Sequence, residues 1–130
     1  MHHDMSTQAA AVFVCFSTLD LSTICARLQK TYHLPDFQYD DHSSWTYAQS
    51  FGQKIGFNVT KTERDDTIAQ WMPGIPTPVN YQILVFLGQK GRVDTSADES
   101  TYANMKAVST FLCDLFGTDL RRIGREYEAE

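Results

Sequence analysis

The stretch Val79–Leu87, VNYQILVFL, decides the fold of this chain. Its last five residues, Ile83–Leu87, are all apolar, which is typical of a strand buried on both faces at the centre of a sheet. The segment Ala11–Phe16, AVFVCF, has the same continuous apolar character and is followed by polar residues. We therefore expect these two strands to lie side by side in the middle of one sheet.

Strands with one polar face are expected further out. Every second residue is bulky in Trp45–Phe51 and again in Ile55–Val59, as expected of half-buried strands. A two-residue turn at Gly52–Gln53 joins the two runs, so the pattern predicts a hairpin from Trp45 to Lys61. A shorter alternation of Phe37 and Tyr39 predicts either one more short strand before the hairpin or the first half of one bent strand that continues into Trp45–Phe51.

Apolar residues spaced three and four positions apart predict two helices. The first follows Asp20, whose carboxylate can cap it, and Pro35 closes its pattern. Its apolar face consists of Leu21, Ile24, Cys25 and Leu28. The second begins with the capping-box pair Ser96 and Glu99 and ends at Gly117. Its expected face consists of Tyr102, Met105, Ser109, Leu112, Cys113 and Phe116.

Together these elements predict a single α+β domain over residues 9–130, preceded by a disordered segment at residues 1–8. The expected architecture is a mainly antiparallel sheet of four to six strands with two helices packed on one face. A short helix around Thr67–Trp71 leads into a stiff loop, Pro73–Pro78, which holds three of the four prolines. For the segment 120–127, with Arg121, Arg122 and Arg125, the sequence allows two alternatives, a last edge strand or a frayed tail.

The composition excludes several classes of function. A chain of 130 residues with 42% hydrophobic residues is typical of one globular domain. The net charge of −5 repels phosphate backbones and argues against a nucleic-acid partner. The longest apolar run, Ala9–Phe16, is too short for a membrane helix. The cysteines, Cys15, Cys25 and Cys113, have no paired spacing and are expected to be small buried hydrophobes in a reducing, cytoplasmic compartment.

No motif of a known catalytic or metal site occurs in the sequence. Asp40 and His42 share a strand face and have the side chains of a metal or acid–base site, but exposed structural residues fit them as well. Asp65 and Asp66 lack the glycine and glutamate of a calcium loop. His3, third behind a free amine, has a copper-chelating geometry, with a frayed terminus as the alternative. We therefore expect no catalysis, no cofactor and no bound metal.

Acidic and aromatic residues gather in one part of the chain and predict a binding surface for a protein. The predicted partner-binding residues are Asp40, Asp41, Trp45, Tyr47, Asp65, Asp66, Trp71 and Tyr81. Two other interpretations stay open. The acids keep a small domain soluble, and the aromatics close the sheet under the proline loop with Trp71 as a buried plug. Alternatively, Trp71, Tyr81 and His42 flank a small-ligand or enzyme pocket under that loop.

A group of residues across the middle of the chain resembles a known family. They are Leu34, Pro35, Phe37, Tyr39, Asp40, Trp45, Gly56, Phe57, Asn58, Val59, Trp71, Pro73, Pro76, Asn80, Tyr81 and Ile83. In these residues the chain resembles small bacterial immunity-type proteins of polymorphic or contact-dependent inhibition toxin systems. The resemblance implies a cytoplasmic protein, monomer or homodimer, that binds one cognate toxin and neutralises it without catalysis. Many such toxins are basic nucleases, which an acidic protein can cover.

Overall fold

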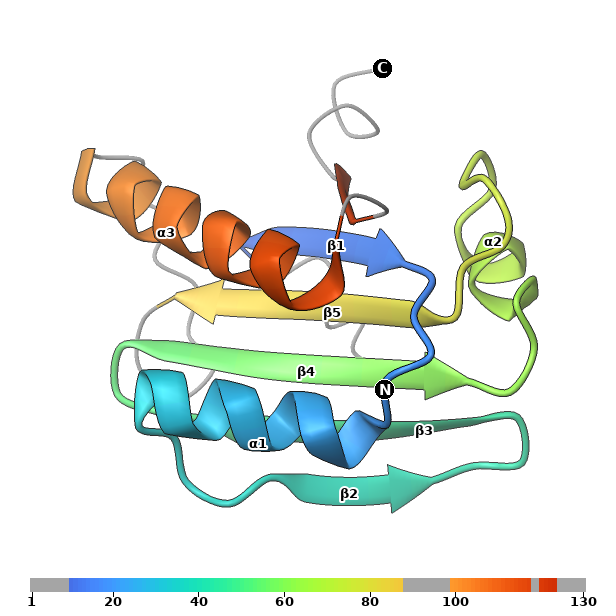
Figure 1. The fold of residues 1–130 in the computed structure, drawn as a ribbon, viewed down its shortest axis with the longest axis horizontal. Helices are drawn as coiled ribbons and strands as arrows, with labels where there is room; N and C mark the ends of the chain where they lie inside the picture. The colour runs from blue at the N-terminus through green and yellow to red at the C-terminus, as the bar shows by residue number, and fades with distance from the viewer. Residues whose placement is uncertain (1–9, 88–98, 118–119, 124–130) are drawn as a thin grey trace, which may run out of the picture.

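The computed structural model describes residues 10–87, 99–117 and 120–123. The strands are β1 (Ala11–Cys15), β2 (Gln38–Asp41), β3 (Trp45–Phe51), β4 (Ile55–Thr62), β5 (Tyr81–Leu87) and β6 (Arg121–Ile123). The helices are α1 (Leu21–Tyr32), α2 (Thr67–Trp71) and α3 (Glu99–Phe116). The described strands form one six-stranded sheet in the order β2-β3-β4-β5-β1-β6 (Figure 1), and all neighbours run antiparallel. The predicted α+β fold with a mainly antiparallel sheet is therefore confirmed.

The two apolar strands lie side by side in the sheet, as predicted. In the β1–β5 ladder Phe13 is opposite Ile83 and Ala11 is opposite Val85. β5 pairs with β4 along its other edge, and β1 pairs with β6 along its other edge. Both strands are thus flanked on both sides, and all five residues of β1 are buried. Of the two alternatives for the segment after α3, the edge strand is present in the described residues as β6.

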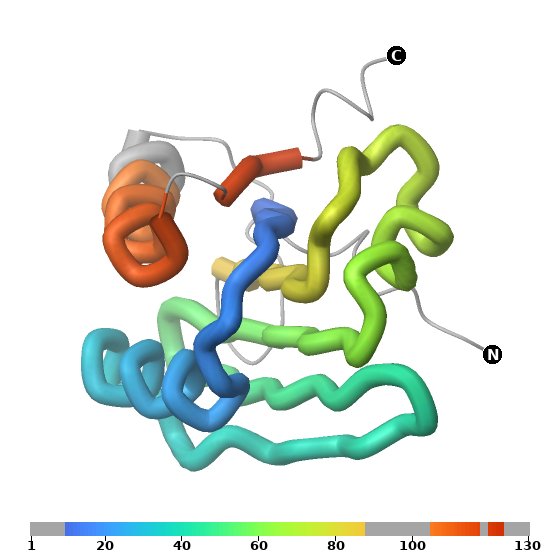
Figure 2. Tube along the Cα trace, turned by 45° about the vertical axis from the view of Figure 1, so that its right-hand side comes forward, coloured from blue at the N-terminus to red at the C-terminus, as the bar shows by residue number. Residues whose placement is uncertain are grey.

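Layers on the two faces of the sheet explain why the central strands are apolar throughout. α1 and α3 lie in front of the sheet in Figure 1, whereas α2 lies on the other side in the turned view of Figure 2. Buried residues of α1 and α3 share one core with alternate residues of β1, β4 and β5. The remaining central positions pack with α2 and the proline loop in a second core of Val12, Val14, Ile68, Ile75, Val79, Leu84, Phe86 and Ile123.

The predicted hairpin is present as β3 and β4, but its turn lies one residue further along the chain. Phe51 is opposite Gly56, and the Gly52 N–H donates to the Ile55 carbonyl over 2.8 Å. Gln53 and Lys54 therefore form the tip, because Gly52 still belongs to the paired backbone. Every second residue of β3 then faces α2, which places Trp45 and Tyr47 on the same side of the sheet.

Several local expectations are corrected. Asp20 is the N-cap residue of α1, but its side chain makes no capping hydrogen bond. The end of α1 before Pro35 is as predicted: the helix ends at Tyr32, and its C-cap residue His33 has a left-handed backbone with φ 55°. Cys113 is exposed rather than buried, because the inner face of α3 follows Met105, Val108 and Leu112. Residues 1–8, Ser96 and Arg125 lie outside the described residues.

The described helices are short or polar. None of them in residues 10–87, 99–117 and 120–123 has a stretch that is long and apolar enough to cross a membrane.

Candidate functional site

Four aromatic rings and one carboxylate meet on the α2 side of the sheet, at the ends of β2 and β3. We call Asp40, His42, Trp45, Tyr47 and Trp71 the aromatic–acid cluster. The His42 imidazole stacks on the Trp45 ring, with centroids 4.8 Å apart and planes at 20°, and it lies 5.7 Å from the Tyr47 ring. Trp71 meets Trp45 edge to face at 5.2 Å and 82°. The rings thus form one continuous surface.

The strand register explains why these residues meet. Asp40 is directly opposite Tyr47 in the β2–β3 ladder, so their side chains point to the same face. The backbone N–H of His42 donates to the backbone carbonyl of Trp45 over 2.8 Å. This hydrogen bond closes the connection between β2 and β3 and brings the two rings together. α2 lies against the same face, and its last residue is Trp71.

Hydrogen bonds and exposure show that the cluster is held in place and still open to solvent. The Tyr47 hydroxyl hydrogen bonds to the Asp40 carboxylate, and this bond together with burial raises the pKa of Tyr47. His42 Nε2 lies 3.5 Å from the same carboxylate. Trp71 is 41% exposed and the Asp40 side chain is 54% exposed. A partner can therefore reach both a large apolar side chain and a negative charge.

The other predicted acids do not join the cluster. Asp41 points to the opposite face, where its carboxylate accepts a hydrogen bond from the Thr46 hydroxyl over 2.7 Å. Asp66 precedes α2 and accepts two hydrogen bonds from Arg64, which lower its pKa. Asp65 is exposed in the same turn, and its backbone carbonyl accepts the Val79 N–H.

Tyr81 was predicted at the binding surface, and there the prediction is wrong. Its side chain is fully buried in the core shared with α1 and α3, and its hydroxyl donates to the Leu19 carbonyl over 2.6 Å. Trp71, which was expected as a buried plug in one interpretation, is exposed instead. Tyr81 and Trp71 lie on opposite sides of the sheet, so they do not flank a common pocket under the proline loop.

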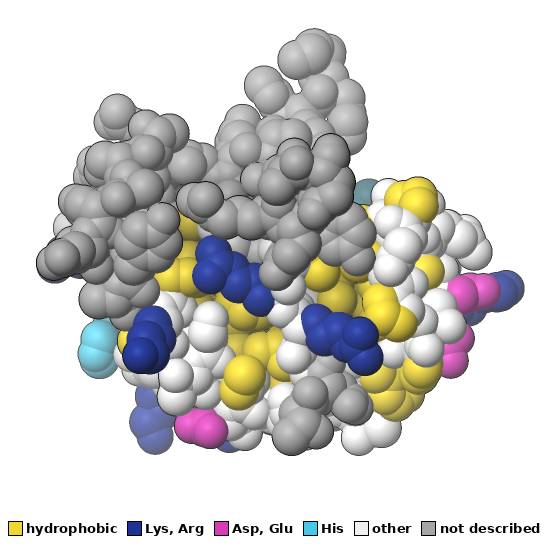
Figure 3. Space-filling view, turned by 90° about the horizontal axis from the view of Figure 1, so that it is seen from above, with side chains coloured by type: hydrophobic (Ala, Val, Ile, Leu, Met, Phe, Trp, Pro, Cys, Tyr) yellow, Lys and Arg dark blue, Asp and Glu magenta, His cyan; other side chains and the backbone are white. Residues whose placement is uncertain are grey.

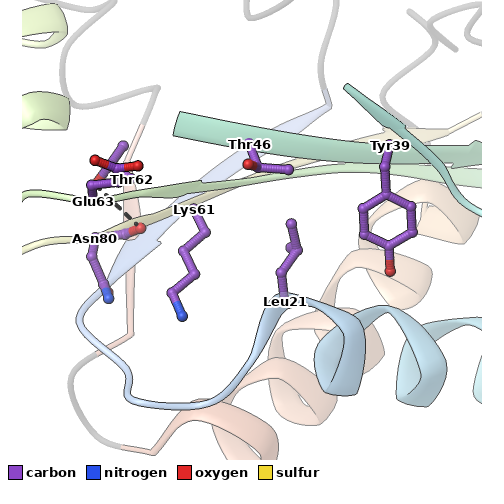
Figure 4. A pocket seen from close by; sticks show the side chains of 7 residues that line it. All are labelled: Leu21, Tyr39, Thr46, Lys61, Thr62, Glu63 and Asn80. Atoms are coloured by element: carbon purple, nitrogen blue, oxygen red, sulfur yellow. Dashed lines mark hydrogen bonds between the residues drawn. The ribbon is translucent and has the colours of Figure 1, made fainter. Parts of the chain in front are cut away.

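A pocket of about 570 Å³ opens on the other face, between the start of α1 and strands β2–β4 (Figure 4). Its lining residues are Leu21, Tyr39, Thr46, Lys61, Thr62, Glu63 and Asn80. Lys61 points into the space below the sheet and donates to the Leu19 carbonyl over 3.4 Å. This pocket was not predicted from the sequence, although Lys61 continues the alternation of Phe57 and Val59 and so places a cation on the apolar face of the strand.

Hydrogen bonds to neighbouring residues occupy several of the polar groups around this pocket. The Asn80 amide exchanges two hydrogen bonds with the Ser17 backbone, and the Thr62 hydroxyl donates to the Arg64 carbonyl. Tyr39 and Cys25 share a hydrogen bond, and burial raises the pKa of Tyr39 to about 12 and that of Cys25 to about 11. Cys25 is therefore a poor nucleophile, as expected for a buried structural thiol.

The two edges of the sheet carry opposite charge. β2 exposes Asp40 and Asp41 at one edge, and β6 exposes Arg121 and Arg122 at the other. Figure 3 views the molecule from the β6 side, where Lys and Arg side chains lie among hydrophobic ones and acidic side chains lie towards the margin. The aromatic–acid cluster is at the acidic end of this arrangement.

Comparison with models of protein families, with curated proteins and with solved structures yields no match.

Proposed function

We propose that this chain is a binding protein that neutralises a cognate toxin domain and that it binds this toxin through the aromatic–acid cluster, without catalysis of its own. The observation that carries the proposal is the exposed tryptophan, Trp71, which packs against Trp45 in the same cluster as an accessible carboxylate, Asp40. The resemblance of the chain to immunity-type proteins supports a toxin as the partner. A cytoplasmic location of this chain is part of the same proposal.

The aromatic side chains favour a protein as the partner. Tryptophan and tyrosine dominate the residues that contribute most to protein interfaces, because they bury a large area with few rotatable bonds. Contact with Trp45 restricts Trp71 before any partner arrives. A side chain that is already ordered loses less conformational entropy on binding, so the cluster is suited to tight association.

The charge of the cluster favours a basic partner. Asp40 and the net charge of −5 attract a positively charged surface and raise the rate of association at low salt. A basic nuclease has such a surface around its active site, because it binds phosphates there. A carboxylate seated on that surface would occupy the place of a phosphate.

Capture followed by a toxicity-rescue assay tests the proposal. The immobilised chain is used to retain proteins from lysate of its own source, and each captured domain is then expressed alone and together with the chain. We expect one small basic domain that is toxic alone and harmless with the chain. If no captured domain is toxic, or if toxicity persists with the chain bound, neutralisation is refuted.

Two variants locate the binding surface. Trp71→Ala should weaken binding of the captured domain by about 30-fold, the loss typical of a central interface tryptophan. Phe111→Ala removes a partly buried aromatic ring from α3, on the other side of the sheet, and should leave the affinity unchanged. Circular dichroism verifies that both variants are folded. Equal affinity of the Trp71 variant and the unmodified chain would place the interface elsewhere.

A further inference from the structure

β2 is an edge strand whose residues are all exposed. Figure 1 shows it at the margin of the sheet, and in the described residues it pairs only with β3. All four residues, Gln38–Asp41, are accessible to solvent. The outer side of such a strand presents backbone N–H and C=O groups to water, and an extended segment of another chain can pair with them.

Acidic side chains select what can pair with this edge. Asp40 and Asp41 are adjacent, so they point to opposite faces of the sheet, as their contacts with Tyr47 and Thr46 show. A second copy of β2 would bring carboxylates next to carboxylates, which is unfavourable across neighbouring strands. A strand with two adjacent basic residues would instead place one cation beside each carboxylate.

The edge is continuous with the aromatic–acid cluster. Asp40 belongs to both, and His42 directly follows β2 and stacks on Trp45. A strand added to β2 would therefore lie next to the rings, and its side chains on the α2 side could contact them. The backbone pairing and the cluster are parts of one surface.

We propose that β2 binds an extended basic segment of the partner by strand addition, with adjacent lysine or arginine residues paired to Asp40 and Asp41. This inference rests on the proposed function, because it names the part of the toxin that the site recognises. It adds a seventh strand to the sheet at the acidic edge formed by β2.

Peptide binding to the isolated chain tests strand addition without the toxin. The probe is a short peptide of threonine and valine with a central Lys–Arg pair, titrated while backbone amide signals are followed by nuclear magnetic resonance. We expect shifts confined to residues 38–41 and their β3 partners. A peptide with Glu–Glu at its centre should not bind. Shifts elsewhere, or equal binding of the acidic peptide, would overturn the proposal.

Two controls separate strand pairing from simple attraction of charges. The same basic peptide with alternate amides N-methylated keeps its charge but cannot form the ladder, so it should lose binding. Asp40→Asn together with Asp41→Asn should weaken binding by about tenfold. Asp65→Asn together with Asp114→Asn removes the same charge outside β2 and should have little effect. Equal binding of the methylated peptide would refute strand addition, because attraction between charges alone would then account for the binding.

The two proposals can fail separately. Binding of the basic peptide with no toxic domain captured would support strand addition and refute neutralisation. If the chain neutralises a toxin but the peptide does not bind at β2, neutralisation is supported and strand addition is refuted.

Discussion

Tyr81 is the residue that ties the segment before α1 to the centre of the sheet. Its hydroxyl donates to the Leu19 carbonyl, and Lys61 approaches the same carbonyl while lying 5.7 Å from the Tyr81 ring centroid. The ring also packs against Phe116 at the end of α3. One side chain of β5 therefore holds the starting point of α1 and the end of α3 at fixed positions.

Replacing Tyr81→Phe should lower the free energy of unfolding by about 1–2 kcal/mol, because the ring stays buried while the hydrogen bond to Leu19 is lost. Urea denaturation measures the change. Tyr32→Phe is the matched control, since the Tyr32 ring packs against Phe57 and Phe111 and can keep those contacts. An unchanged midpoint for Tyr81→Phe would mean that water replaces the hydroxyl at no cost.

At the scale of elements, the β3–β4 hairpin depends on a close approach between two facing residues. Gly56 lies opposite Phe51, and a Cβ at position 56 would collide with the Phe51 ring. This ring covers the glycine and reaches Phe86 on β5, with centroids 5.3 Å apart. The absent side chain of Gly56 thus makes room for an aromatic contact that joins β3 to the second core.

Gly56→Ala should destabilise the domain by about 1–3 kcal/mol, because the added methyl group forces the Phe51 ring away from Phe86. Thermal unfolding followed by circular dichroism gives the change. Gln53→Ala, at the exposed tip of the same hairpin, should shift stability by less than about 0.5 kcal/mol. Similar effects of the two substitutions would show that the Phe51 ring moves freely.

The sequence pattern predicted β1, β5, the β3–β4 hairpin and α1 well, because continuous burial in β1 and β5, alternation in β3 and helical spacing of buried residues in α1 each leave a clear signal. The apolar run 83–87 and the alternation in 45–51 each have one simple structural solution. The site was harder to predict, since sequence shows which residues share a strand face but not which layer covers that face. Tyr81 shares its face with Ile83 and lies under α1 and α3, whereas Trp71 stays exposed because α2 buries Ile68 instead.

The whole molecule should lose stability in alkaline solution. Burial raises the pKa of Cys25 from 9.0 to about 11, and the pKa values of Tyr39 and Tyr81 are raised as well. The folded state therefore holds these protons more tightly than the unfolded state. This stabilising contribution is complete below about pH 9 and is lost as the pH rises towards 11.

The expected slope for Cys25 is at most about 1.4 kcal/mol per pH unit, with a smaller contribution from the half-exposed Tyr39. Urea unfolding at a series of pH values from 8 to about 11 measures it, and Cys25→Ala should flatten the decline. Cys113→Ala, at an exposed position on α3, should reproduce the decline of the unmodified chain. A pH-independent stability above pH 9 would contradict the burial of Cys25 as a neutral thiol.

The position of β1 between β5 and β6 has a consequence for synthesis of the chain. β2, β3 and β4 can pair with one another as soon as they leave the ribosome, because short connections join them. β1 is made first but finds its partners only after β5 and β6 have emerged. Throughout that interval the apolar strand AVFVC is exposed in the nascent chain, so it is the segment that a chaperone at the ribosome would bind.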